Sequence, residues 1–234
     1  MHMSYLQSLV LIFLVPILYL SCRSFSKIRK VAIFSLAVSI PVAITFELIA
    51  FGDNAWYVPQ STFAFRLFGV IPIEDLLWQF MTVYLIIIFY EHFCNKEFLP
   101  SISPKIHIMN YVLYSIALVV VAIFTICASI IKIPYAFLWL GILFFPIQIV
   151  LFLWKYPQFS RSFLRVQLYF LYTHMIFELI GVKFSHWVFG GSHYIGWVSV
   201  LGQRFPLEEL IFVMLLGALA ACTYYEFFTN KKLA

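Results

Sequence analysis

The sequence predicts an all-α, polytopic membrane protein with seven transmembrane helices, arranged as two parallel three-helix repeats joined by a linker helix. Three observations lead to this prediction. The 234 residues are 64% hydrophobic and only 11% charged, which is more apolar surface than a soluble core of this size can bury. Apolar stretches recur that are long enough for a membrane helix, which needs about 20 residues. Finally, the same short acidic motifs occur twice.

The apolar stretches define the predicted spans, and the basic residues define their orientation. Eleven of the 15 Lys and Arg residues fall in one alternating set of loops and chain ends, and four fall in the other. The positive-inside rule therefore places the amino terminus outside and the carboxyl terminus in the cytoplasm, and we expect the cell (inner) membrane. The predicted spans are residues 4–22, 31–51, 74–93, 108–131, 136–154, 163–182 and 208–228.

An internal repeat relates the first three helices to the last three. Phe-Glu-Leu-Ile begins at Phe46 and again 131 residues later at Phe177, and Pro-x-Glu begins at Pro72 and again 134 residues later at Pro206. Three-helix units joined directly would be inverted, whereas one extra crossing gives both the same orientation. Both acidic motifs are therefore expected on one side of the membrane. The predicted division is residues 1–98 for the first repeat, 99–134 for the connecting helix and 135–234 for the second repeat.

Carboxylates are the candidate catalytic groups, because an acidic residue inside a membrane is costly and usually marks a functional site. Eight of the ten acidic residues form repeat-matched pairs. Pro72 and Pro206 suit the first helical turn, so the acids that follow face its free amides. A helix-starting role would also explain a single Pro-x-Glu, but the recurrence favours a site. The candidates are Glu208, Glu209, Glu74, Asp75, Glu178 and Glu47.

Neighbouring carboxylates in an apolar site cannot all ionise, so at least one is expected to keep its proton near neutral pH. Such a group can donate a proton to a weakly basic substrate. Glu91 and Glu226 lie at the opposite helix ends beside aromatic residues. We interpret these two as interfacial or structural.

Three further residues are candidates for substrate binding. Trp56 and Trp187 follow the two acidic helix ends, where they are either interfacial anchors or an aromatic wall that stabilises cations. His174 lies one helical turn before Glu178 and has no counterpart in the first repeat. It is either a packing histidine or a group that hydrogen-bonds Glu178 or relays a proton. No metal-ligand spacing is present, so we expect neither metal nor cofactor.

At these residues the sequence resembles the integral-membrane lycopene cyclase domain family, in which two such units occur as paired small subunits or as a fused domain. The signature is a duplicated acidic helix end, a following Trp, and Pro-Leu-Glu-Glu at the start of the last helix, which Pro206 to Glu209 match fully. Asp75 departs from the second Glu of that motif. Glu47 and Glu178 stand where many relatives have Asp.

The resemblance implies a lycopene β-cyclase, an intramolecular lyase or isomerase of carotenoid biosynthesis that closes linear end groups into β-ionone rings without redox change. It implies a carotenoid substrate such as lycopene, within the lipid bilayer, and other carotenoid-pathway enzymes as partners. No nucleic acid is expected. Two alternatives stay open: a small parallel-repeat membrane transporter, and a non-catalytic carotenoid-binding membrane protein.

Overall fold

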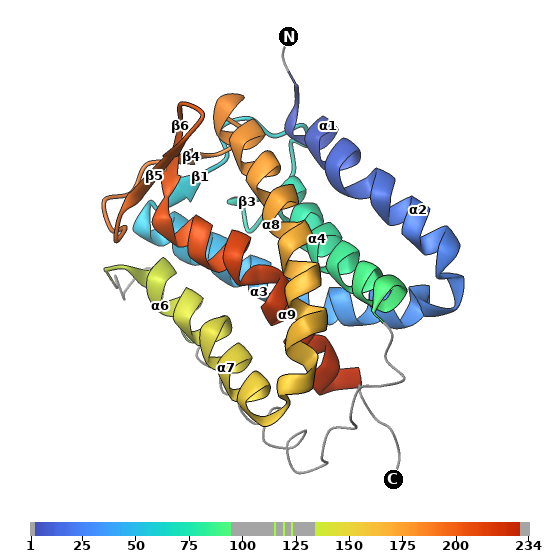
Figure 1. Ribbon diagram of the computed structural model, residues 1–234. Coiled ribbons are helices and arrows are strands. Elements are labelled where there is room, and N and C mark those ends of the chain that lie inside the picture. The colour runs from blue at the N-terminus through green and yellow to red at the C-terminus, as the bar shows by residue number, and fades with distance from the viewer. Residues whose placement is uncertain (1–2, 95–114, 116–118, 120–122, 124–133, 230–234) are drawn as a thin grey trace.

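The computed structural model describes residues 3–94, 115, 119, 123 and 134–229, and Figure 1 shows their arrangement. Six of the seven predicted helices lie in these residues, and each of the six is helical. The predicted span 108–131 falls almost entirely outside the described residues.

The first three predicted helices are all present near their predicted bounds. The first is built from α1 (Tyr5–Leu9), the π-helical turn η1 (Val10–Leu14) and α2 (Val15–Arg23). The wide turn comes immediately before Pro16, which has no backbone N–H for a regular helical hydrogen bond. A 3-10 turn, η2 (Phe25–Lys27), leads into α3 (Ile28–Asp53), and α4 (Ile73–Phe93) follows a loop.

Two of the last three predicted helices, the fifth and the seventh, are interrupted more strongly. The fifth is divided at Phe145 into α6 (Ala136–Phe144) and α7 (Pro146–Lys155), because Pro146 again removes a helical donor. A 3-10 turn, η3 (Pro157–Phe159), precedes α8 (Ser160–Lys183). The seventh begins as the π-helical segment η4 (Glu209–Leu215) and continues as α9 (Gly217–Thr229) after a bend of 49°.

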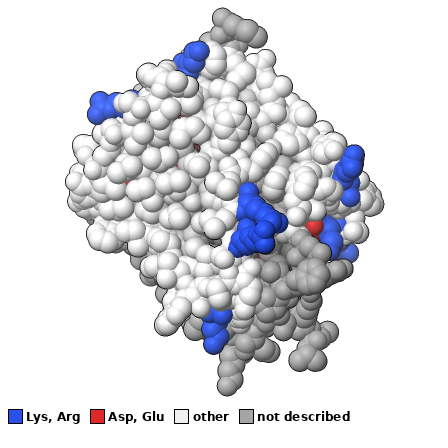
Figure 2. Space-filling view, in the orientation of Figure 1, with Lys and Arg blue, Asp and Glu red and all other residues white. Residues whose placement is uncertain are grey.

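Four helical stretches in the described residues are long and apolar enough to cross a membrane, or five if the bent pair η4 and α9 counts as one span. The helix α8 is not among them, because buried polar residues such as Gln167, Thr173 and His174 lower its hydropathy. The view in Figure 2 shows a mostly uncharged surface with scattered Lys and Arg and almost no acidic side chain. This is the surface of a membrane protein. The four stretches are Tyr5–Arg23, Phe25–Asp53, Ile73–Phe93 and Ala136–Lys155.

The helices α4 and α9 form the centre of the bundle and pack against each other. The helices α2, α3 and α8 surround α4, while α7 and α8 pack against α9. The side chains of Tyr90 on α4 and Tyr225 on α9 are fully buried where the two helices meet, with their ring centroids 6.4 Å apart. These two tyrosines occupy matching positions of the predicted repeat, 135 residues apart.

The two loops that follow α3 and α8 meet at one end of the bundle (Figure 1). The strand β1 (Trp56–Tyr57) of the first loop pairs antiparallel with β4 (Val188–Phe189) of the second. Each loop also returns to its next helix through a short hairpin. These hairpins are β2 (Arg66–Leu67) with β3 (Ile71–Pro72), and β5 (Trp197–Val200) with β6 (Gln203–Pro206).

The helix ends that lead into these two loops share one backbone geometry. Asn54 after α3 and Ser185 after α8 are both left-handed, with φ of 52° and 55°. The amide of the following residue then bonds back to the helix: Ala55 N to Ala50 O, and His186 N to Gly181 O, each at 2.8 Å. Such bonds satisfy carbonyls that a helix end leaves without partners. The chain therefore turns in the same way 131 residues apart.

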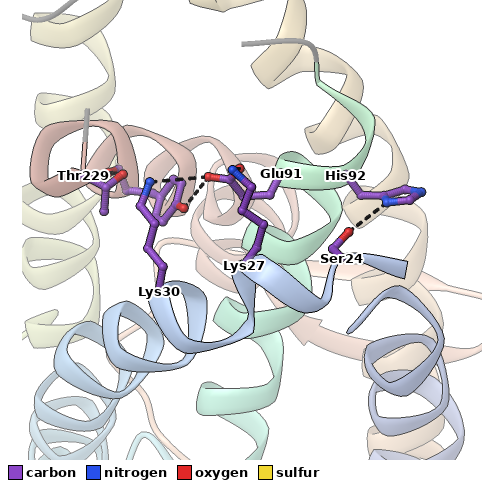
Figure 3. A network of polar contacts seen from close by, with 7 residues as sticks. Ser24, Lys27, Lys30, Glu91, His92 and Thr229 are labelled. Atoms are coloured by element: carbon purple, nitrogen blue, oxygen red, sulfur yellow. Dashed lines mark hydrogen bonds and ion pairs between the residues drawn. The ribbon is translucent and has the colours of Figure 1, made fainter. Parts of the chain in front are cut away.

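A separate polar network lies at the opposite end of the bundle (Figure 3). The Glu91 carboxylate is 3.6 Å from Lys27 Nζ and 3.7 Å from Lys30 Nζ. It also accepts a hydrogen bond from the Tyr225 hydroxyl. Glu91 thus joins α4 to α3 and α9, as its interpretation as a structural residue predicts.

Candidate active site

A cavity of about 130 Å³ lies among α3, α4, α8 and η4, beneath the two loops. A cavity of comparable size, about 150 Å³ in another protein, accepts a benzene molecule, so this space suits one ring-sized apolar group. Its wall combines aromatic rings with acidic side chains, which is uncommon for a buried apolar space. The aromatic lining residues include Phe46, Trp56, Trp78, Phe137, Phe177 and Trp187.

Four carboxyl groups line this cavity, and they come from both halves of the chain: Glu47, Asp75, Glu178 and Glu209. The charge of Glu47 interacts with Asp75 and Glu209, and that of Glu209 interacts with Glu178. Asp75, Glu178 and Glu209 are less than one-tenth exposed. The structure therefore brings together four of the six carboxyls predicted from sequence as one connected acid cluster.

In each half of the chain, a tryptophan indole donates a hydrogen bond to one of the glutamates of the cavity. Trp56 Nε1 donates to Glu47 Oε1 at 3.1 Å, and Trp187 Nε1 donates to Glu178 Oε1 at 3.1 Å. Of the two roles the sequence left open, the aromatic wall is the one that fits, since both indoles line the cavity. The indole donors also fix one oxygen of each carboxyl group.

Tyr5 is a site residue that the sequence did not single out. Its hydroxyl donates to Asp75 Oδ1 at 2.7 Å, across 70 residues of sequence. The Tyr5 ring stacks on His186 with a centroid separation of 5.5 Å. No local pattern at the amino terminus indicates this contact, because it depends on how α1 packs against α8 and α4.

Glu74 and Glu208 lie elsewhere, although both are fully buried. Glu74 accepts hydrogen bonds from the Ser61 hydroxyl at 2.7 Å and from the backbone amides of Thr62 and Phe63. Glu208 accepts one from Ile195 N at 2.8 Å. The sequence predicted that these acids face the amides of their own helix, but their partners are amides of the preceding loop. They hold the two loops against the helix ends.

Tyr194 belongs to the second loop and connects it to the first loop. Burial, followed by the charges of Glu209 and Glu208, raises the pKa of Tyr194, so its phenol stays protonated. The hydroxyl donates to the carbonyl of Ala55 in the other loop. His193 lies beside it, with Nδ1 2.9 Å from Asp53 Oδ1 at the end of α3. The two loops are thereby tied to each other above the cavity.

His174 lies on the cavity wall, among aromatic rings. It is 3% exposed, and its ring centroid is 5.9 Å from that of Phe170 and 6.4 Å from that of Phe13. Within the described residues, neither ring nitrogen of His174 has a hydrogen-bond partner. Also within them, no group of three or more His, Cys, Asp or Glu side chains is arranged to hold a metal ion.

Comparison with known proteins finds a family similarity in the first part of the chain. No curated protein and no solved structure matches the chain. Residues 2–93, which run from before α1 to the end of α4, match the family model described as lycopene cyclase. This segment supplies Tyr5, Glu47, Trp56 and Asp75 to the cavity. Residues 2–93 of this membrane protein are therefore similar to the lycopene cyclase domain family.

Proposed function

We propose that the protein is a lycopene cyclase, which closes linear carotenoid end groups to β-ionone rings by proton-initiated cyclisation. The observation that carries this proposal is the acid cluster in the aromatic cavity, with two carboxyls from each half of the chain. Proton transfer needs an acid and a base within reach of one apolar group. The lycopene cyclase domain over residues 2–93 supports a carotenoid as that substrate.

The hydrogen bonds within the cluster favour Glu209 as the proton donor. Glu47, Glu178 and Asp75 each accept a hydrogen bond from an indole or phenol, and such a bond stabilises the ionised form of a carboxyl group. Among the described residues, none donates a hydrogen bond to Glu209. Because four neighbouring carboxyls in an apolar space cannot all be ionised, we propose that Glu209 keeps its proton.

The reaction needs no electrons from outside the substrate. The Glu209 carboxyl transfers its proton to the terminal double bond, which leaves a tertiary cation. The internal alkene attacks this cation and forms the carbon–carbon bond that closes the ring. A base then takes a proton from a ring carbon, and the ring double bond forms. The faces of Trp56, Trp187 and Phe177 line the cavity, where electron-rich rings stabilise the passing cation.

We also propose seven membrane spans and two parallel repeats, with residues 99–134 as the connecting unit. The shared backbone geometry after α3 and α8 supports the repeat, and the pairing of β1 with β4 supports placing both loops on one side. The lysines around Glu91 lie at the other end, as expected for a cytoplasmic face.

Expression in a host that accumulates lycopene tests the proposed function. We expect a product with one or two cyclic end groups, whose absorption spectrum is shifted because each new ring double bond is twisted out of the polyene. Chromatography and mass spectrometry should show a product with the mass of lycopene, since the reaction is an isomerisation. A Glu209→Gln chain expressed at the same level is the control. Unchanged lycopene with the wild-type chain would refute the proposal.

A further inference from the structure

The two halves of the acid cluster differ at one cavity position. Glu47 and Glu178 are repeat equivalents, and four residues before them stand Ala43 and His174. All four side chains line the cavity. Residues four apart on a helix lie on the same face, so an imidazole is placed beside one carboxyl and a methyl group beside the other. The aromatic and acidic lining is otherwise closely matched, since Phe46 and Trp56 correspond to Phe177 and Trp187.

The imidazole is also unusual because it has no polar partner. His174 is 3% exposed, and within the described residues both of its ring nitrogens lack hydrogen bonds. Leaving a buried polar group unsatisfied costs about 1–3 kcal/mol. A packing residue at this position would not require that cost, because the equivalent Ala43 packs without it. Because His174 lines the cavity, its unpartnered nitrogens are available to a substrate bound there.

We infer that His174 is the base that takes the proton from the ring carbon after closure, and that it sets the position of the ring double bond. This inference rests on the proposed function. A neutral imidazole surrounded by Phe13 and Phe170 has a free lone pair and no competing donor. The tertiary cation, by contrast, is a very strong acid once the ring has closed.

The proton removed in this step is returned to the carboxyl groups within the site. The carbon–hydrogen bond of the ring carbon breaks, its electron pair becomes the ring double bond, and the proton joins a nitrogen of His174. The imidazolium then returns a proton to the carboxyl cluster, which lost one to the substrate, and Glu178 lies one helical turn away on the same face of α8. The protein therefore returns to its starting protonation state after each turnover, and no electrons are gained or lost.

The carboxyl groups are less suited to this role. One oxygen of Glu47 and one of Glu178 are held by indole donors, and Asp75 is held by the Tyr5 hydroxyl. If the base and the acid are different residues, the base can also lie beside a different carbon of the substrate from the one that receives the proton. The asymmetry between Ala43 and His174 then fixes which carbon loses its proton.

His174→Gln tests the inference, because Gln keeps a polar side chain of similar size but is not a base. Purified wild-type and variant proteins in lipid vesicles are given lycopene that carries deuterium at the ring carbon that loses its proton. We expect the rate to fall by about 10²–10⁴-fold, as for loss of a general base. We also expect a larger deuterium effect and new ring isomers. Thr173→Val is the matched control, since the Thr173 hydroxyl bonds only to Tyr169 O of its own helix.

Each outcome decides the question. A His174→Gln enzyme with the wild-type rate and ring product would overturn the inference, and so would a slower enzyme with unchanged isotope effect and product, which indicates packing alone. If His174→Gln does not elute as folded protein in detergent, His174→Asn undergoes the same measurements. A wild-type protein that leaves lycopene unreacted would refute the proposed function itself, whereas cyclisation by both proteins at the same rate and to the same ring product refutes only the role of His174.

Discussion

Replacing Glu209 with Gln is expected to lower the rate of cyclisation by about 10²–10⁴-fold, the usual contribution of a general acid. Gln keeps the volume and polarity of the side chain but cannot release a proton to the substrate. Glu209 is buried and lines the cavity, where the end group of the substrate is proposed to bind. The measurement is the initial rate in lipid vesicles, with folded protein quantified by elution in detergent.

Two matched variants sharpen this result. Glu209→Asp keeps the acid with a shorter reach, as Asp75 does in the first half, and is expected to recover part of the rate. Glu226→Gln removes a carboxyl that is also buried but lies outside the cavity lining, and it should leave turnover per folded molecule nearly unchanged. Full activity of Glu209→Gln would show that the proton comes from another group.

Replacing Glu74 with Ala is expected to cause the largest loss of stability. The change leaves the Ser61 hydroxyl and the amides of Thr62 and Phe63 without their acceptor. Each of these hydrogen bonds contributes about 0.5–1.5 kcal/mol to stability. Thermal unfolding in detergent should therefore show a clearly lower midpoint, and limited trypsin digestion should cut sooner at Arg66 in the released loop.

Glu208→Ala is the internal comparison for this prediction. Glu208 holds one loop amide, that of Ile195, so its removal should cost less stability than removal of Glu74. The protein that stays folded at low temperature should still cyclise its substrate, because neither side chain lines the cavity. Equal midpoints for wild type and Glu74→Ala would contradict the loop-holding role, and a folded but inactive Glu74→Ala would point to a role in the chemistry.

The sequence indicated the acid pairs but not which acid of each pair faces the cavity. Glu74 and Asp75 are neighbours, and successive helical residues point about 100° apart around the helix axis. The rotation of α4 therefore decides which one enters the site, and that rotation follows from long-range packing. The loop amides that bind Glu74 carry no side-chain signal at all.

The sequence predicts a repeat because short motifs recur in it at nearly fixed spacing. The sequence also identified the two tryptophans. It did not indicate their role as donors to Glu47 and Glu178, because that role depends on how each loop folds back over the helix end. The interrupted course of the last predicted span was not anticipated, since η4 and α9 meet at a bend of 49°. Gly217 begins α9 directly after this bend, and glycine weakens a helix at such a position.

The contact between the two loops has a consequence for how the halves of the chain are held together. Ala55 O of the first loop accepts hydrogen bonds from Gly190 N and Gly191 N at 3.1 and 3.3 Å, beside the pairing of β1 with β4. The halves therefore recognise each other through their own surfaces, and the covalent connection acts by raising the effective concentration of one near the other, commonly to the millimolar range. Confinement of both halves to the plane of a bilayer also raises the effective concentration of one near the other. The connection thus contributes to the rate and yield of assembly, while the fit of the two halves determines the shape of the cavity.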